Sequence, residues 1–198
     1  MGTGHTRWRW RSRAAGLTRA VGGGDHAGVY PTIHAALICY FTALVLLLAA
    51  RRDGVARVAY SLGLALLVAH VLLAYHGFHG WSQAHVLAHT AGQTFAVAGV
   101  RTSVGVYVNY AVMAVWLADV VWWWRSGAGA YRRRGRGVTV AVHAFLLFVT
   151  FNATVVFASG VVSWVGVGAF AVLAGLVARV ALRGSTATPV ESESRGAG

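Results

Sequence analysis

The sequence predicts an all-α integral membrane protein with about five transmembrane helices and one amphipathic helix at the membrane interface. Hydrophobic residues make up 57% of the 198-residue chain and charged residues only 11%, whereas soluble domains carry about 25% charged residues. Several long stretches carry no charge, and apolar runs of about 18 residues or more are typical of transmembrane helices. Arginine lies mainly in short segments between these runs, where it acts as a topogenic signal.

The two ends of the chain differ from its middle. Residues 1–31 are rich in Arg, Gly and Trp and lack the run of about 7–15 apolar residues that a cleavable signal peptide needs. We expect this segment to be a disordered basic tail, and we expect the polar C-terminal tail, residues 183–198, to be disordered as well. The middle, residues 32–182, is predicted to form a polytopic membrane domain.

The apolar runs of the middle part accommodate five spans. The first ends at Arg51-Arg52-Asp53, and the third ends in three tryptophans, typical of an aromatic belt at a membrane surface. The last run, 138–182, is too long for one helix that rises about 1.5 Å per residue through about 30 Å of hydrocarbon. We therefore divide it near Ser159-Gly160. The predicted spans are 32–50, 58–75, 105–124, 138–158 and 162–182.

An amphipathic helix is predicted over about 82–98, between the second and third spans. With a step of about 100° per residue, polar and apolar residues separate onto opposite faces. The polar face carries Ser82, His85, His89 and Gln93, and the apolar face carries Trp81, Ala84, Leu87, Ala88, Ala91 and Phe95. Such a helix lies in the interface plane or caps the bundle.

The placement of arginine predicts the orientation. Under the positive-inside rule, the loops 51–57 and 125–137 and the end of the last span face the cytoplasm. Five spans satisfy this with the N-terminus outside and the C-terminus inside, although five tail arginines are then exported. An alternative with six spans, in which 82–100 crosses, leaves three loop arginines outside and places two histidines and two glutamines in the membrane. We expect five spans, in a bacterial-type cytoplasmic (inner) membrane.

The charge excludes some partners and favours others. All 17 basic residues are arginine and the formal net charge is +12, but their position beside apolar runs indicates contact with anionic lipid headgroups, not nucleic acid. The predicted partners are the bilayer itself and a membrane protein or a second copy of the chain. The single cysteine, Cys39, excludes an intramolecular disulfide and a cysteine metal motif.

A histidine cluster is the first candidate site, because five of the nine histidines fall within residues 70–89. His85 and His89, at i and i+4, can share a metal ion. A third ligand from another helix would complete a Zn, Cu or Fe site, and two histidines from different spans could hold haem. The candidate ligands are His70, His76, His79, His85, His89 and His34.

Two other interpretations of these histidines stay open. Interfacial histidines are also satisfied by water, headgroups or backbone, and they also serve as pH sensors. The HExxH motif of zinc proteases is absent, because Val86 follows His85. The cofactor is therefore unknown, with a metal ion or haem as the candidates.

The second candidate site is an intramembrane charge pair. Asp119, His143 and Arg179 fall at similar depth on the side of the arginine-rich loop. An intramembrane carboxylate costs about 2.5–3.5 kcal/mol, so Asp119 needs a partner. We expect Arg179 or His143, in a proton relay or in a structural ion pair. Asn109 and Asn152 are further polar residues within the predicted spans.

No catalytic motif points to an enzyme. The chain contains neither a GxxxxGK[ST] phosphate loop nor a GxSxG nucleophile elbow. The sequence favours a structural or accessory membrane component without chemistry of its own. The alternative is a membrane redox protein or one that binds a metal or haem through the histidines, and the third interpretation is a proton-coupled transporter or an oligomeric channel.

Overall fold

The computed structural model describes residues 28–50, 52–158 and 160–185, and every regular element in these ranges is a helix. Five helices are long and apolar enough to cross a membrane, and a sixth is shorter, which confirms the predicted fold class. The spans are Val29–Ala49, Asp53–Gly77, Val104–Arg133, Arg136–Val156 and Val161–Arg183. The protein is therefore a polytopic helical membrane protein.

Two of the spans end in a π-helical turn. The elements are α2 (Val29–Val45), η1 (Leu46–Ala50), α3 (Asp53–Gly77), α4 (Gln83–Ala98), α5 (Val104–Arg133), α6 (Arg136–Phe151), η2 (Asn152–Val156) and α7 (Val161–Ser185). The helix α4 matches the predicted amphipathic helix. Gly160, with φ +66°, directly precedes α7, close to the predicted turn. Residues 1–27, 159 and 186–198, which include most of both predicted tails, lie outside the described residues.

The arginine-rich loop differs from its prediction. The helix α5 continues to Arg133, past the predicted end at residue 124, with a kink at Gly127. There φ is +75° and ψ is 167°, a conformation that glycine adopts without steric cost. The kink turns the last residues of α5 back, so that Tyr131 stacks on Trp123 with ring centroids 4.1 Å apart.

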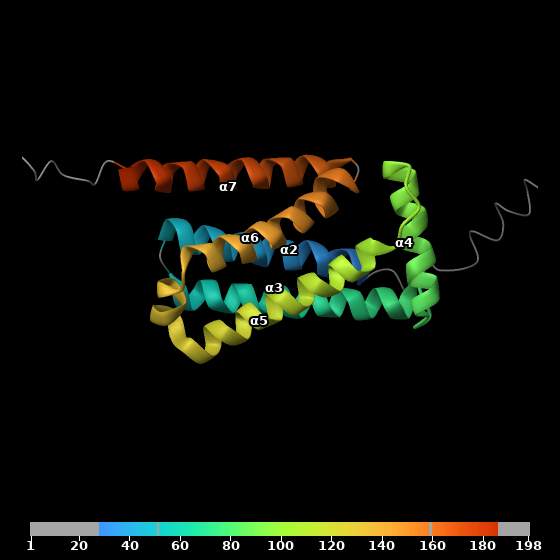
Figure 1. The fold of residues 1–198 in the computed structure, drawn as a ribbon, viewed down its shortest axis with the longest axis horizontal. Helices are drawn as coiled ribbons and strands as arrows, with labels where there is room; N and C mark the ends of the chain where they lie inside the picture. Colours follow the sequence, from blue (N-terminus) through green and yellow to red (C-terminus); the bar gives the residue numbers. More distant parts are fainter. Residues whose placement is uncertain (1–27, 51, 159, 186–198) are drawn as a thin grey trace, which may run out of the picture.

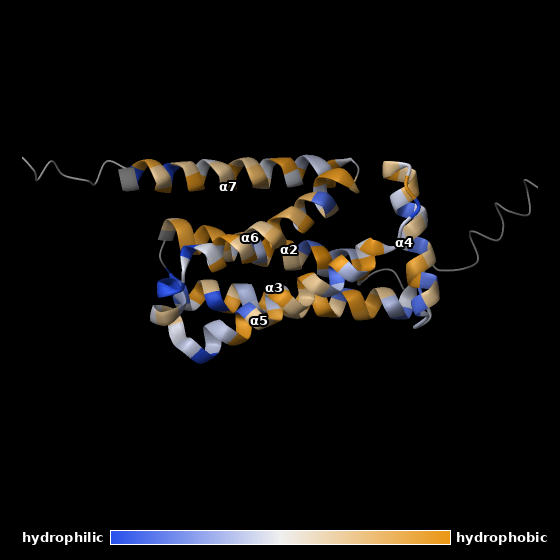
Figure 2. Cartoon of the chain, in the orientation of Figure 1, coloured by the Kyte–Doolittle hydropathy of each residue, from blue (hydrophilic) through white to orange (hydrophobic). Residues whose placement is uncertain are grey.

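The helices form a bundle with two distinct ends (Figure 1). The helices α2, α3, α5 and α6 lie alongside one another, α7 lies on the outside, and α4 lies across one end. Hydrophilic residues gather near the two ends (Figure 2). We call one the arginine end (residues 52–57, 125–137 and 179–183) and the other the histidine end (residues 70–110 and 148–157).

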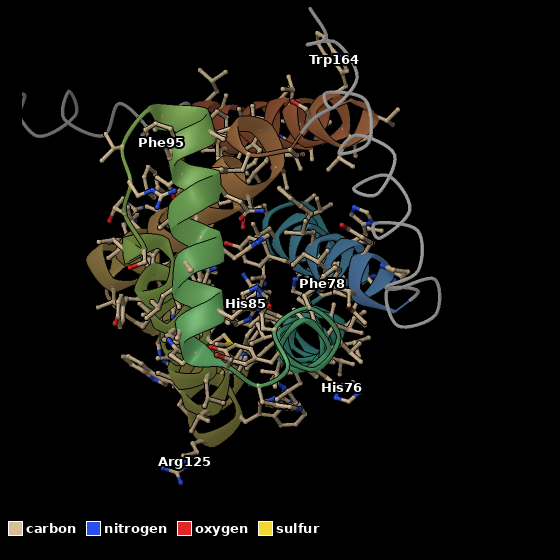
Figure 3. All side chains as sticks on the ribbon, turned by 90° about the vertical axis from the view of Figure 1, so that its right-hand side faces the viewer. His76, Phe78, His85, Phe95, Arg125 and Trp164 are labelled. Atoms are coloured by element: carbon tan, nitrogen blue, oxygen red, sulfur yellow. The ribbon has the colours of Figure 1, made fainter. Side chains whose placement is uncertain are left out.

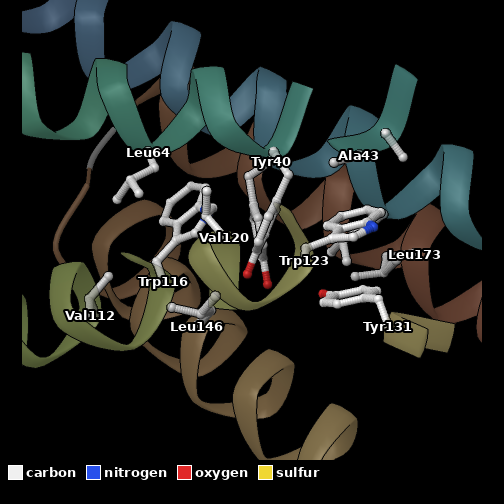
Figure 4. Packing of buried hydrophobic residues seen from close by; sticks show 13 residues of the cluster. Tyr40, Ala43, Leu64, Val112, Trp116, Val120, Trp123, Tyr131, Leu146 and Leu173 are labelled. Atoms are coloured by element: carbon white, nitrogen blue, oxygen red, sulfur yellow. The ribbon is translucent and has the colours of Figure 1, made fainter. Parts of the chain in front are cut away.

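The core is built around aromatic rings, with Val, Leu and Ala side chains packed against them (Figure 4). The ring of Trp116 lies 5.1 Å from that of Tyr40 and 5.3 Å from that of Tyr60, so α5 packs against both α2 and α3. Gly63 makes this approach possible, because a Cβ atom there would lie 3.0 Å from the Trp116 ring. The Trp122–Trp124 triplet, predicted as an aromatic belt, is split, since Trp123 is buried and its two neighbours are exposed.

The outer helix α7 buries few of its own residues against the rest of the bundle. Of its residues with described side chains, Gly166 and Leu173 alone are buried. Gly166 sits against Thr154 of η2, where a Cβ atom would lie 2.9 Å from the Thr154 hydroxyl. A cavity of about 750 Å³ lies between α7 and α2, which touch through the rings of Phe170 and Phe41, and it is lined mainly by apolar side chains such as Leu37, Val165 and Val172.

Candidate functional site

At the arginine end, Asp119 is the centre of a buried hydrogen-bonded network. Its side chain is only 2% exposed. One carboxylate oxygen, Oδ2, accepts hydrogen bonds from the hydroxyls of Tyr60 (3.0 Å) and Tyr131 (2.8 Å). The other, Oδ1, forms an ion pair with the guanidinium of Arg134. Both oxygens therefore have partners, as a buried carboxylate requires.

Arg134 is held as firmly as Asp119. Its Nε donates to the hydroxyl of Thr139 at 3.0 Å, and a terminal nitrogen donates to the hydroxyl of Tyr131 at 3.0 Å. The guanidinium also lies 4.0 Å from the centre of the Tyr131 ring, a cation–π contact. This network joins α3, α5, the chain after α5 and α6.

The partner of Asp119 is not either of the two expected residues. Arg179 is exposed on α7, and within the described ranges the ion pair of Asp119 is with Arg134. His143 packs by its ring against Tyr40 (6.4 Å) and Tyr60 (6.0 Å) beside the network. Arg134 was overlooked because the sequence assigns it to a loop, and only the kink at Gly127 returns that loop to the bundle.

A second ion pair at the arginine end is exposed to solvent. Arg132 donates through Nε to both carboxylate oxygens of Asp53 at 2.7 Å. The side chains are 37% and 22% exposed. This pair ties the start of α3 to the end of α5, but solvent reaches both charges.

At the histidine end, three of the six candidate ligands gather. His79, in the connection between α3 and α4, has its ring 5.2 Å from that of His85 and 5.4 Å from that of His89. Partial burial lowers the pKa of His79, and the neighbouring His89 and His85 lower it further. In the described part of the chain, Nδ1 of His79 is buried without a hydrogen-bond partner.

The other three histidines lie elsewhere. His70 forms a hydrogen bond through Nδ1 to the carbonyl oxygen of Val29 (2.8 Å), which ties α3 to the start of α2. His34 lines the cavity between α2 and α7. His76 is exposed and projects away from α4, whereas His85 lies on the side of α4 that faces α3 (Figure 3).

Three of the candidate metal ligands approach one another, but not in the arrangement of a metal site. Among the described residues, no group of three or more His, Cys, Asp and Glu side chains is placed so that it could hold a metal ion. The three gathered rings meet edge to face, at interplanar angles of 77° and 64° for the two pairs.

The connection into α4 has an uncommon backbone. Gly80 and Trp81 both adopt positive φ, +52° and +61°. A bulky residue in this region costs of order 1–3 kcal/mol and persists only where its surroundings impose it. The chain tolerates this cost where it turns from α3 to lay α4 across the bundle.

The helix α4 packs on the bundle through Val86 and the part-buried Thr90 and Thr94, whereas the residues of its predicted polar face are exposed. Val86, its single buried residue with a described side chain, lies on the wheel next to His89 and Gln93. Phe95, on the predicted apolar face, is 54% exposed. Gln83 fixes this orientation, because its side-chain oxygen accepts hydrogen bonds from Tyr75 of α3 and from Tyr110 of α5 (2.9 Å).

A second cavity lies between α4 and the bundle, with a volume of about 550 Å³. It is bounded by α4, α5 and the junction of α6 and η2. Asn109 and Asn152, the two asparagines of the predicted spans, both line it, together with Gln93 of α4. Antiparallel packing of the predicted spans places Asn109 and Asn152 in the same layer as the histidines, but no pattern in the sequence predicts that they line one cavity with Gln93.

No family model, curated protein or solved structure matches this chain. The functional argument therefore rests on the two ends of the bundle and on α7. At the arginine end Asp119 and Arg134 have partners on several elements, and at the histidine end carboxamides border a cavity.

Proposed function

We propose that this protein is an accessory component of the membrane that acts by binding another membrane-spanning chain and not by catalysis. One observation carries the proposal: α7 is long enough to cross the bilayer but buries very little of itself against its own bundle. Trp164 and Leu182 are 77% and 69% exposed. Helices in membranes associate through close packing, so a helix with a free face is suited to a partner.

We assign the apolar surface around the cavity between α2 and α7 to this partner. The wall of this cavity is almost entirely apolar, and Gly168 on α7 has no other atom within 4 Å of a Cβ position. Gly175 has the same open space one heptad further on. Small residues on one face let the backbones of two membrane helices approach closely.

Native mass spectrometry of the protein extracted from its own membranes tests this proposal. We expect a complex of defined stoichiometry, with a second copy or with another membrane protein. Gly168→Leu, which fills the cavity wall, is expected to abolish the complex, whereas Ala174→Leu, on another face of α7, is expected to preserve it. A monomer in every variant, or a complex that Gly168→Leu leaves unchanged, would contradict the proposal.

We further propose that the arginine end faces the cytoplasm, in a bacterial-type inner membrane, where it contacts anionic headgroups. The arginine-bearing segments, Arg52–Arg57, 125–137 and Arg179–Arg183, lie at the same end of the bundle, which supports this orientation. A fluorescent protein fused to the C-terminus is expected to fluoresce, and an alkaline phosphatase fused there is expected to be inactive. The opposite pattern would reverse the orientation.

Metal or haem binding by the histidine cluster is the second candidate. The close approach of His79, His85 and His89 favours it, although the side chains do not form a ligand geometry. Elemental analysis and a visible spectrum of the purified protein test it. A metal near one per chain, or a haem band, that is lost in the His85→Ala/His89→Ala variant would establish the site, and a colourless, metal-free folded protein would exclude it.

A further inference from the structure

The cavity under α4 has the make-up of a ligand site. Its volume of about 550 Å³ falls within the range of about 300–1,000 Å³ that is common for small-molecule pockets. Such pockets combine apolar walls with a few polar groups that converge from different elements. We call this space the amide cavity, after the carboxamides of Gln93, Asn109 and Asn152 that line it.

The three carboxamides come from three elements. Gln93 belongs to α4, Asn109 to α5 and Asn152 to the π-helical turn η2. The Asn152 amide nitrogen donates to the carbonyl oxygen of Phe148 at 2.8 Å, which uses one of its N–H groups and leaves the other. Each carboxamide has two N–H donors and an oxygen that accepts, so the polar part of the cavity can donate hydrogen bonds to the carbonyl oxygens of a ligand.

The rest of the lining is uncharged. Among the described residues, those that line the amide cavity include no Asp, Glu, Arg, Lys or His. Phe148 and Phe157 provide aromatic surface, and Val97, Val108 and Val149 provide aliphatic surface. Aromatic side chains pack well against a flat or apolar molecule, but nothing here would neutralise an ionised group.

Two local features of the chain place the polar side chains that line the cavity. The helix α4 brings Gln93 to the edge of the cavity, where its side chain stays exposed, and packs on the bundle through Val86. The π-helical turn η2, which positions Asn152, is a form that appears often at functional sites. Asn152 is half-buried and Asn109 and Gln93 are exposed, so the cavity is open to its surroundings.

We propose that the amide cavity binds an uncharged amphiphile whose polar end carries carbonyl oxygens. The carbonyl oxygens accept hydrogen bonds from the carboxamide N–H groups, and the apolar body lies against the phenylalanines and valines. Two sources share this chemistry in a membrane: a quinone ring and the ester carbonyls of a neutral diacyl lipid.

Thermal unfolding of the full chain in nanodiscs, with and without added probe, tests the proposal. The probes are decylubiquinone for the quinone source and dioctanoylglycerol for the neutral lipid source. A ligand that binds the folded state raises the unfolding midpoint in a saturable manner. We expect one of the two probes to raise the midpoint by several degrees, and the probe that does so identifies the source.

Three variants assign the shift to the cavity. Asn109→Leu replaces one carboxamide by an apolar side chain of similar size. It is expected to weaken the apparent affinity for the probe about tenfold. Ala96→Phe places a ring in the cavity lining and is expected to abolish the shift. Ala84→Phe, at an exposed position of α4 outside the lining, is the matched control and is expected to retain the full shift.

The proposal is overturned if neither probe raises the midpoint. It is also overturned if a shift is equal in Ala96→Phe and Ala84→Phe, because the probe then acts through the bilayer. If Asn109→Leu fails to fold, Ala96→Phe and its control still decide the question, since both keep every polar group of the cavity.

Discussion

The two ends of the bundle differ in the exposure and the hydrogen bonding of their polar side chains. At the arginine end, Asp119 and Arg134 are each 2% exposed in their side chains and have hydrogen-bond partners on several elements. At the histidine end, His85, His89 and Gln93 are exposed, and the carboxamides of α4, α5 and η2 line a cavity. A buried, paired charge therefore lies at one end, and carboxamides that border a cavity lie at the other.

This difference indicates which end maintains the fold and which end can bind. A buried ion pair resists the loss of one partner, since the remaining charge is then left uncompensated in a medium of low dielectric. Its partners are fully engaged, so it has little capacity for a ligand. The histidine end has that capacity, and the division of roles predicts opposite consequences for substitutions at the two ends.

The largest effect is expected from breaking the buried ion pair. Arg134→Ala should lower the free energy of unfolding by about 3–5 kcal/mol, because the Asp119 carboxylate is left buried without its counter-ion. Denaturant unfolding in detergent measures this. Arg132→Ala breaks the exposed pair with Asp53 and should cost less than about 1 kcal/mol.

Replacing both residues of the ion pair distinguishes a purely structural pair from a functional site. Asp119→Leu with Arg134→Met should recover most of the loss, because apolar residues of similar size often replace a buried pair without cost. Equal, small losses of unfolding free energy in Arg134→Ala and Arg132→Ala would contradict the assignment of the arginine end as the end that maintains the fold.

The next effect concerns glycines at two helix contacts. Gly63→Ala should destabilise the protein by about 1–3 kcal/mol, since the new Cβ atom would lie 3.0 Å from Trp116 and 3.2 Å from the carbonyl oxygen of Ala36. Gly105→Ala, at the contact of α5 with α4, meets only Thr90 at 3.4 Å. We expect it to change stability by less than about 1 kcal/mol, since alanine also favours the helix. A similar loss at both positions would mean that the histidine end is packed as tightly as the core.

The smallest effect is a pH dependence at the histidine end. The folded state lowers the pKa of His79 below its ordinary value of about 6.5, so the unfolded connection binds more protons just below that pH. The stability contributed by neutral His79 is therefore complete above about pH 6.5 and declines as the pH falls. The titratable groups around it are His85, His89 and Tyr75, whose ring lies 6.1 Å away.

Hydrogen exchange of residues 78–89 in nanodiscs measures this dependence. Exchange should accelerate as the pH falls below about 6.5, after correction for the intrinsic rate. His79→Gln should flatten the profile. An unchanged profile in that variant would assign the pH dependence to the other two histidines.

Much of the fold could be predicted from the sequence, because it follows from the length of apolar runs and from helical periodicity. The five spans and the helix over 82–98 agree with the structure to within a few residues, apart from the end of α5 and the start of the second span. The long α5 was not predicted, since Arg132 and Arg133 read as loop residues. A glycine kink is what allows these arginines to continue a helical turn beside the bundle.

The sites could be predicted only in part, because side chains from distant segments meet through packing that local patterns do not encode. The sequence correctly indicates that Asp119 needs a partner, but depth in the membrane does not identify Arg134 among the basic residues. The clustering of His79 with His85 and His89 follows from the turn at Gly80 and Trp81. The meeting of Asn109, Asn152 and Gln93 depends on how α4 lies across the bundle, which no spacing predicts.

The most direct test of the division between the two ends is the unfolding midpoint with and without decylubiquinone or dioctanoylglycerol, compared between Asp119→Asn and Asn109→Leu. We predict that Asp119→Asn lowers the midpoint of the free protein but keeps the rise on adding the active probe. Asn109→Leu should keep the midpoint of the free protein and lose most of the rise. A folded Asp119→Asn protein that no longer responds to the probe, or an Asn109→Leu protein that responds fully, would contradict the account.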